Sequence, residues 1–276
     1  MTHRDPWGPV EQHPTPFPEL DALVVELVER AREILGSSFV GAYLQGSAAL
    51  GDLDEASDCD FLVPVRGPID PEQEAGLRRL HDEIPTRLGQ WSTELEGSYP
   101  EETELRSVRS LGRPWLYIDR GSREMQWSTH CNTEVVRWIL RERGITLAGP
   151  DPRTLVDEVP GDLLRARMRT EIPRFLTELQ TWTTFDIAWA QRYAVATYCR
   201  MLQTLHSGRV TSKRAALLWG REALDPGWEP LLTQVLEDRP LPWDAPPRPG
   251  SVAETLRFAR YAEELAAAPT LPRRDR

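Results

Sequence analysis

The spacing of apolar residues predicts the first elements of the chain. Between residues 18 and 35, apolar positions recur every three or four residues up to Gly36, a pattern that indicates an amphipathic helix. The apolar runs "FVGAYLQ" and "DFLVPV" predict two neighbouring buried strands, separated by a Gly46-Ser47 turn and a short helix at "SAAL". A helix that begins at Pro71 and a third strand at "WSTELEGSY" are predicted next.

The second half of the chain has a different pattern. A possible strand "WLYID", a helix around "TEVVRWILRER" and a turn or linker near residues 148–153 complete the first region. Beyond Gly161 the spacing predicts helices alone, over residues 161–180, 186–207, 212–223, 228–237 and 250–267. We therefore expect an α+β fold with three parts: an irregular lead-in over residues 1–18, a mixed β-sheet domain with helices over residues 19–160, and an α-helical bundle over residues 161–276.

Size and composition are those of a globular protein. The 276 residues suit two domains, and 40% hydrophobic with 28% charged residues suits packed cores. No apolar run approaches the ~20 residues of a membrane span, and the N-terminal stretch lacks the apolar core of a signal peptide, so we expect a cytoplasmic protein that binds no membrane. The formal net charge of −10 disfavours nucleic-acid binding and is compatible with a cationic partner. Cys59, Cys131 and Cys199 are widely spaced without a CxxC pair, which predicts reduced buried thiols.

Candidate chemistry gathers in the stretch "YLQGSAALGDLDEASDCDFLVPV". Alternation along a strand projects Asp58 and Asp60 to one side, while Cys59 and Phe61 point into the core. Two carboxylates this close repel each other unless a cation lies between them, and Mg²⁺ is commonly held by one or two carboxylates together with substrate phosphates. The acidic stretch "GDLDEASD" also suits a surface turn, but a turn alone leaves unexplained why acidic residues run directly into "FLVPV".

The turn before these aspartates has the features of a phosphate site. Gly46 lets the backbone approach a ligand closely, and Ser47 lies where a helix start offers amides and a hydroxyl to an anion. A third carboxylate is expected from the strand "STELEGSY", on which Glu94 and Glu96 share one face opposite Leu95. Either could join the metal ions or accept a proton from an attacking hydroxyl; we favour Glu96 for both roles, with Glu94 as the alternative.

Two blocks of sequence carry a family resemblance. "GSAALG" followed by "SDCDFLV" resembles the signature of the nucleotidyltransferase superfamily that includes the DNA polymerase beta type enzymes. "QRYAVATYCRMLQTLHSGRVTSKRAALLWG" resembles the C-terminal helical domain of the aminoglycoside adenylyltransferases that modify streptomycin and spectinomycin, and "ITLAGPDPRTLVDEVP" resembles their interdomain segment. The resemblance extends from about residue 20 to residue 265 and is loose outside these blocks.

The resemblance implies a nucleotidyltransferase fold for residues 19–160 and an antibiotic-resistance activity. One or two Mg²⁺ ions would assist transfer of AMP from ATP to a hydroxyl of a small cationic, sugar-like acceptor, such as streptomycin or spectinomycin, with release of pyrophosphate. By matching position, Arg200 and Lys213 would grip the nucleotide phosphates, and Trp182 and Asp186 would contact the acceptor. We expect the enzyme to be a monomer.

The chain also departs from this family. The family's middle-segment Trp that contacts the acceptor matches His130 here, with Trp127 three residues earlier, so both remain candidates for acceptor binding. A second acidic position near the acceptor falls at Ala190. Alternative interpretations are a surface role for Arg200 and Lys213, and an imidazole of His130 that serves only a structural hydrogen bond.

Two other functions remain open on the sequence. A nucleotidyltransferase of the same architecture could act on another hydroxylated metabolite or on a protein side chain, and the sequence excludes neither GTP nor CTP as donor. A nucleotide-binding regulator could retain the fold without turnover. The complete set of Gly46, Ser47, Asp58, Asp60 and Glu96 favours the enzyme over the regulator.

Overall fold

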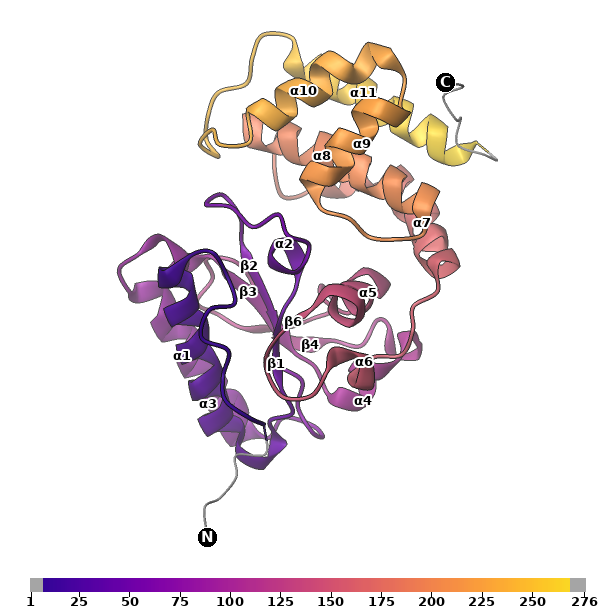
Figure 1. Cartoon of the computed structure of the whole chain (residues 1–276). Coiled ribbons are helices and arrows are strands. Elements are labelled where there is room, and N and C mark those ends of the chain that lie inside the picture. The colour runs from indigo at the N-terminus through magenta and orange to yellow at the C-terminus, as the bar shows by residue number, and fades with distance from the viewer. Residues whose placement is uncertain (1–6, 269–276) are drawn as a thin grey trace. The chain divides into compact units, whose positions relative to one another are not determined.

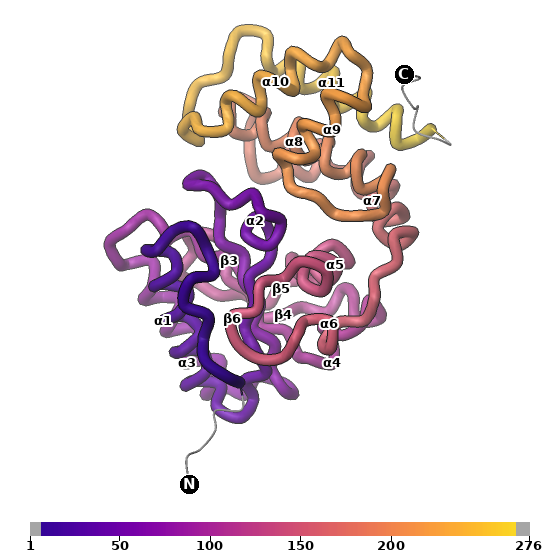
Figure 2. The backbone as a smooth tube through the Cα atoms, viewed as in Figure 1, coloured from indigo at the N-terminus to yellow at the C-terminus, as the bar shows by residue number. Residues whose placement is uncertain are grey.

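A computed structural model of the protein describes residues 7–268 (Figures 1 and 2). The chain divides into two compact units, Met1–Val159 and Pro160–Arg276, which are described separately below. Residues 1–6 of the expected lead-in and residues 269–276 of the expected helical domain lie outside the described residues.

The first unit contains a six-stranded mixed sheet with the order β5-β4-β3-β2-β1-β6. Its strands are β1 (Ala42–Leu44), β2 (Cys59–Leu62), β3 (Leu95–Tyr99), β4 (Trp115–Ile118), β5 (Gln126–Ser128) and β6 (Ile145–Ala148). β2 and β3 are parallel and every other pair is antiparallel. Parallel neighbours need a crossover connection, which α3 (Pro71–Glu83) provides. The mixed sheet confirms the predicted fold class.

Each face of the sheet has its own core. On one face, the fully buried Cys59 and Phe61 pack in a cluster with apolar residues of α1 (Pro18–Leu35) and α3, as the alternation along β2 predicts. On the other face, Leu62 of β2 packs in a second cluster with residues of three further helices. These helices are α4 (Glu102–Arg106), α5 (Glu134–Arg143) and α6 (Pro152–Leu155). Figure 1 shows α1 and α3 on one side of the sheet and α5 and α6 on the other.

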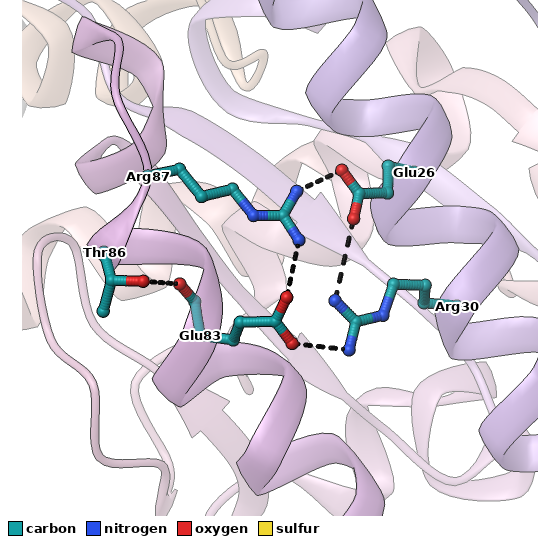
Figure 3. A network of polar contacts seen from close by, with 5 residues as sticks. All are labelled: Glu26, Arg30, Glu83, Thr86 and Arg87. Atoms are coloured by element: carbon teal, nitrogen blue, oxygen red, sulfur yellow. Dashed lines mark hydrogen bonds and ion pairs between the residues drawn. The ribbon is translucent and has the colours of Figure 1, made fainter.

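Four charged side chains connect α1 to the C-terminal end of α3 (Figure 3). Arg30 of α1 contacts Glu83 of α3 at 2.8 Å and Glu26 at 3.6 Å. Arg87 contacts the same Glu83 at 3.0 Å and also pairs with Glu26. The hydrogen bond from Arg87 is the largest cause that lowers the pKa of Glu26, and the hydrogen bond from Arg30 is the largest that lowers the pKa of Glu83. Because these groups are partly exposed, salt is expected to weaken the network.

The core beneath α3 contains a buried histidine. His81 stacks against Phe61 with ring centroids 5.7 Å apart, and its Nε2 lies 2.8 Å from the hydroxyl of Tyr99. Burial lowers the pKa of His81 to about 3. The imidazole is therefore neutral in the folded protein over the physiological pH range.

This histidine should make folding stability fall in mild acid. The unfolded chain takes up a proton on His81 as the pH falls below about 6.5, whereas the folded chain does not until about pH 3. Protonation therefore favours the unfolded state, and the unfolding free energy falls as the pH drops from about 6.5 toward about 3. Between about pH 7 and about pH 5, this one side chain should cost about 2 kcal/mol of unfolding free energy. Urea unfolding at both pH values should show a smaller loss for His81→Gln than for the natural protein. Identical losses would contradict the assignment.

The second unit is helical, as predicted. Its helices are α7 (Gly161–Leu179), α8 (Ala188–Ser207), α9 (Lys213–Ala223), α10 (Glu229–Glu237) and α11 (Ser251–Ala267). α8 packs against α7, α9 and α11, and α9 packs against α10; Figure 2 follows this part of the backbone. α8 ends at Gly208, whose φ of 68° is a left-handed conformation that glycine adopts without strain. Over the part of the chain that the structure describes, no helix has the length and apolar character to cross a membrane.

Candidate active site

The Gly46-Ser47 turn lies directly against the strand that carries the predicted aspartates. After β1, the amide of Gln45 donates to the carbonyl oxygen of Asp60 at 2.9 Å, and the single turn α2 (Gly46–Ala49) follows. A Cβ atom added to Gly46 would lie 1.8 Å from Oδ2 of Asp60, and the φ of Gly46 is +56°. Ser47 Oγ donates to the carbonyl oxygen of Asp58 at 3.4 Å. Glycine is therefore required where the turn meets the carboxylate.

The acidic loop between the turn and the strand has two parts. Asp54 accepts hydrogen bonds from Ser57 Oγ at 2.8 Å and from the amide of Ala56 at 3.2 Å. Such contacts are typical of an aspartate that stabilises a turn. Asp58 and Asp60 come after this turn, where the chain enters β2. The surface-turn interpretation therefore describes residues 54–57, and it does not account for the two aspartates that follow.

Asp60 and Glu96 face each other across two central strands. They are directly paired in the parallel register of β2 and β3, so both side chains project from the same face of the sheet. This is the face that α4, α5 and α6 cover further along the strands. The register thus brings a carboxylate from each strand to one place beside the Gly46-Ser47 turn.

Glu94 does not lie on the strand, in contrast to the sequence prediction. It follows a short 3₁₀ helix (Gln90–Thr93) with φ −102° and ψ 0°, and β3 begins only at Leu95. Alternation therefore does not extend back to Glu94. Its carboxylate pairs with Arg120 Nε at 2.5 Å, a contact that favours Glu96 over Glu94 as the third carboxylate of the site.

Glu96 belongs to a polar cluster that the sequence did not predict. Its Oε1 accepts a hydrogen bond from the hydroxyl of Tyr117 at 3.0 Å and lies 3.2 Å from Nε2 of His130. The hydroxyl of Tyr117 is also 2.9 Å from Oδ1 of Asp119. The alternation of "WLYID" could have placed Tyr117 and Asp119 on one face, but not next to Glu96, because that depends on which strand β4 pairs with.

The surroundings of this cluster shift two pKa values upward. Burial is the largest cause of the raised pKa of Tyr117, followed by the negative charges of Glu96 and Asp119. The hydrogen bond with Glu96 is the largest cause of the raised pKa of His130, and partial burial opposes it. Tyr117 therefore keeps its proton and remains a hydrogen-bond donor.

The acidic side chains near the turn suit a magnesium ion whose remaining ligands come from a substrate. Within residues 7–268, no group of three or more His, Cys, Asp and Glu side chains is arranged to hold a metal ion by itself. Asp60 and Glu96 nevertheless offer carboxylate oxygens from adjacent strands, and Asp58 is next but one along the chain. Mg²⁺ is commonly bound by one or two carboxylates while phosphates and water supply the remaining ligands. The donor set therefore fits this ion.

The three cysteines are free and buried, as predicted. Burial raises the pKa of Cys131 to about 12 and that of Cys59, which lies beside Asp58 and Asp60 in the chain, further still. Both thiols are therefore protonated at neutral pH, and protonated thiols are poor metal ligands.

In the second unit, the two predicted phosphate-binding cations, Arg200 of α8 and Lys213 of α9, lie on the same side of α8. Tyr193 and Arg200 are seven residues apart on this helix, a spacing that projects both side chains from the same side. Lys213, the first residue of α9, places its Nζ 4.8 Å from the centroid of the Tyr193 ring. Both cations therefore lie on the Tyr193 side of α8.

Of the two predicted acceptor residues in the second unit, Trp182 lies next to Tyr193 and thus on the side of α8 where Lys213 lies. Trp182 follows α7 and is 60% exposed, so it is not an ordinary core residue. Its ring lies 6.0 Å from that of Trp189 and 6.1 Å from that of Tyr193; we call these three residues the Trp182 aromatic cluster. Asp186 is exposed just before α8 and accepts a hydrogen bond from Thr184 Oγ1 at 3.2 Å. Ala190 is fully buried in a small core.

The structure does not bring the other two predicted acceptor residues together. Trp127 of β5 is paired with Leu116 of β4, which belongs to the core on the α1 and α3 face. His130 contacts Tyr117, which projects from the opposite face. Only His130 is therefore on the same face as Glu96.

Comparisons with known proteins match both units. Residues 154–239 match the family described as aminoglycoside adenylyltransferase, C-terminal domain. A spectinomycin 9-adenylyltransferase of Staphylococcus aureus is 27% identical over 209 residues, which cover 71% of this chain and 75% of the relative. An aminoglycoside (3'') (9) adenylyltransferase of Shigella flexneri is 25% identical over 240 residues, covering 78% of this chain and 86% of the relative.

A solved structure has the same fold. It is a spectinomycin adenyltransferase from Enterococcus faecialis, determined with ATP and spectinomycin, and it aligns with a TM-score of 0.67 at 16% identity over 90% of this chain and 99% of its own. Together with the sequence matches, this alignment confirms the resemblance and the enzyme class that the sequence predicts. The chain is a nucleotidyltransferase related to the aminoglycoside adenylyltransferases.

Proposed function

We propose that this protein transfers AMP from ATP to a hydroxyl of an aminoglycoside such as spectinomycin or streptomycin, in a Mg²⁺-dependent reaction that releases pyrophosphate. The observation that carries the proposal is the pairing of Asp60 with Glu96 beside the Gly46-Ser47 turn. The names of the relatives supply the donor and the class of acceptor.

Each residue of the first unit has a separate task in this reaction. Asp58, Asp60 and Glu96 would hold one or two Mg²⁺ ions, which supply charge neutralisation on the phosphoryl oxygens. Ser47 and the amides of its turn would bind the triphosphate. The acceptor oxygen attacks the α-phosphorus, the bond to the β-phosphate oxygen breaks, and Glu96 receives the hydroxyl proton.

The second unit would supply positive charge to the donor and an aromatic surface to the acceptor. Arg200 and Lys213 would contact the phosphates of ATP. Trp182 offers an exposed indole for a sugar ring or a cation, and Asp186 offers a carboxylate for an ammonium or guanidinium group. In the first unit, His130 lies close enough to Glu96 to contact an acceptor there, whereas Trp127 is on the other face.

Lys213 allows a direct test of the phosphate contact, because it is the only lysine in the chain. Amine-reactive labelling followed by peptide mass analysis should modify Lys213 more slowly when ATP and Mg²⁺ are present. Lys213→Ala should raise the KM for ATP by about 10-fold, since a hydrogen bond to a charged group is lost. Arg214→Ala, which removes a charge from the next position, should leave the KM nearly unchanged. Unaltered labelling together with an unaltered KM would contradict the assignment.

The acceptor is tested by comparing aminoglycosides with other hydroxylated amines. Pyrophosphate release should require ATP, Mg²⁺ and an aminoglycoside together. A thermal-shift series should show a higher melting temperature with the true acceptor when ATP and Mg²⁺ are also present, because ligands that bind only the folded state stabilise it. Failure of every aminoglycoside would favour another metabolite or a protein side chain as acceptor. Nucleotide binding without turnover on any acceptor would favour the regulator.

A further inference from the structure

The proposed base is held by one of its two carboxylate oxygens. Tyr117 and His130 both reach Oε1 of Glu96, at 3.0 Å and 3.2 Å. Two neighbours on one oxygen restrict rotation of the carboxylate about its terminal bond. The orientation of the other oxygen, Oε2, is then fixed as well.

Tyr117 is the better fixed of these two neighbours. It lies in the middle of β4 and is paired with Ser98 of β3 on one side and with Gln126 of β5 on the other. Its side chain is only 3% exposed, and its ring is tilted against that of His130 with centroids 5.2 Å apart. His130 itself is exposed and lies in the turn after β5. A buried phenol on a strand that is paired on both sides is therefore the rigid contact to Glu96.

The hydroxyl of Tyr117 has one hydrogen and two carboxylates within reach. Asp119 Oδ1 lies 2.9 Å away, but the same oxygen also accepts the backbone amide of Arg120 at 3.0 Å. Asp119 is exposed, so water can supply it with further donors. Glu96 is only partly exposed, so it has less access to water and depends more than Asp119 on the hydrogen bond from Tyr117.

We propose that Tyr117 is a positioning residue for Glu96, whose hydroxyl holds Oε1 so that Oε2 is directed toward the hydroxyl of the acceptor. The inference rests on the proposed function, with Glu96 as the base. It assigns a role in the transfer reaction to a side chain that acts through its contact with Glu96.

The test is a double-mutant cycle between Tyr117→Phe and Glu96→Gln, measured as kcat and as KM for ATP. Tyr117→Phe removes the hydroxyl and keeps the ring, so it should lower kcat by about 10-fold through misalignment of the base while the KM for ATP stays unchanged. In the Glu96→Gln background the same change should have little further effect, because the group to be positioned is already lost. Tyr261→Phe in the second unit, which removes a hydroxyl that accepts the backbone amide of Asp225 at 3.0 Å, should retain kcat within about twofold of the natural protein.

The outcomes separate the inference from the proposed function. The positioning role would be overturned, with Glu96 still the base, if Tyr117→Phe had the kcat of the natural protein. It would also be overturned if Tyr117→Phe lowered kcat equally in the natural protein and in Glu96→Gln. A natural rate for Glu96→Gln would overturn the base and the positioning role together. Melting temperatures of the variants show whether a loss of rate comes from a loss of folded protein.

Discussion

Asp60→Asn is expected to lower kcat for AMP transfer by about 10³-fold while leaving the fold intact, because a carboxylate that is proposed to hold the metal ion against the phosphates is replaced by a neutral amide. The two side chains have nearly the same shape, so the packing beside Gly46 is preserved. Asp60 also directly faces Glu96, so both ends of the proposed metal site are affected by the change. Pyrophosphate release with ATP, Mg²⁺ and a responsive aminoglycoside measures the effect.

The matched control is Asp82→Asn, which changes charge in the same way on α3. Asp82 is exposed and pairs with Arg123 at 2.7 Å. The Asp82→Asn variant should retain the natural rate, because exposed ion pairs contribute little to stability and α3 carries none of the proposed site residues. If Asp60→Asn also kept the natural rate, the assignment of Asp60 as a carboxylate that holds the metal ion would fail.

Gly46→Ala is expected to lower activity by at least about 10²-fold, because displacement of a reacting group by about 1 Å has an effect of this size. The added Cβ would lie 1.8 Å from Oδ2 of Asp60, so either the turn or the carboxylate must move. Both are part of the proposed site, since the turn would hold the triphosphate and the carboxylate would hold Mg²⁺. The rate of AMP transfer and the melting temperature should be measured together.

Gly51→Ala is the control for backbone strain. Gly51 has a φ of +70°, close to the +56° of Gly46, but a Cβ added at Gly51 meets no atom within 4 Å. Both substitutions should therefore destabilise the protein by about 1 kcal/mol through the left-handed backbone, and only Gly46→Ala should collide with the site. Equal activity of the two variants would mean that the close approach of Gly46 to Asp60 has no part in catalysis.

The helices were the most predictable part of the fold. α1 begins at Pro18 and ends before Gly36, as the apolar spacing and these two residues indicate. The helices of the second unit agree with the predicted ranges to within two residues, because their apolar spacing is periodic and each has at least one end marked by Gly, Pro or a capping residue such as Ser212. These signals are local, and local signals can be found in a single sequence.

The edges of the sheet could not be predicted in the same way. β5 and β6 have only three and four residues, too few for a clear alternation. No strand was predicted between the helix around "TEVVRWILRER" and the linker near residues 148–153, where β6 pairs with β1 about 100 residues earlier in the chain. Such a pairing is decided by the partner strand, and the segment itself carries little signal for it.

In the candidate site, too, local features could be predicted from the sequence and contacts that depend on strand pairing could not. Gly46, Ser47, Asp58 and Asp60 lie within one short stretch, so their proximity follows from a strand, a turn and a return strand. The contact of Tyr117 with Glu96 depends on the antiparallel register of β4 with β3, in which Ser98 faces Tyr117. For Glu94 a local signal was misleading, since the apparent alternation continued into a 3₁₀ turn.

The register between β2 and β3 makes the site all-or-none. Sliding β3 by one residue would turn Glu96 to the face of α1 and α3 and bring Leu95 opposite the turn, because side chains alternate along a strand. A molecule with misaligned strands would then be inactive, without any intermediate level of activity. After refolding from denaturant, a count of competent sites would therefore report directly on the share of molecules whose sheet is correctly aligned.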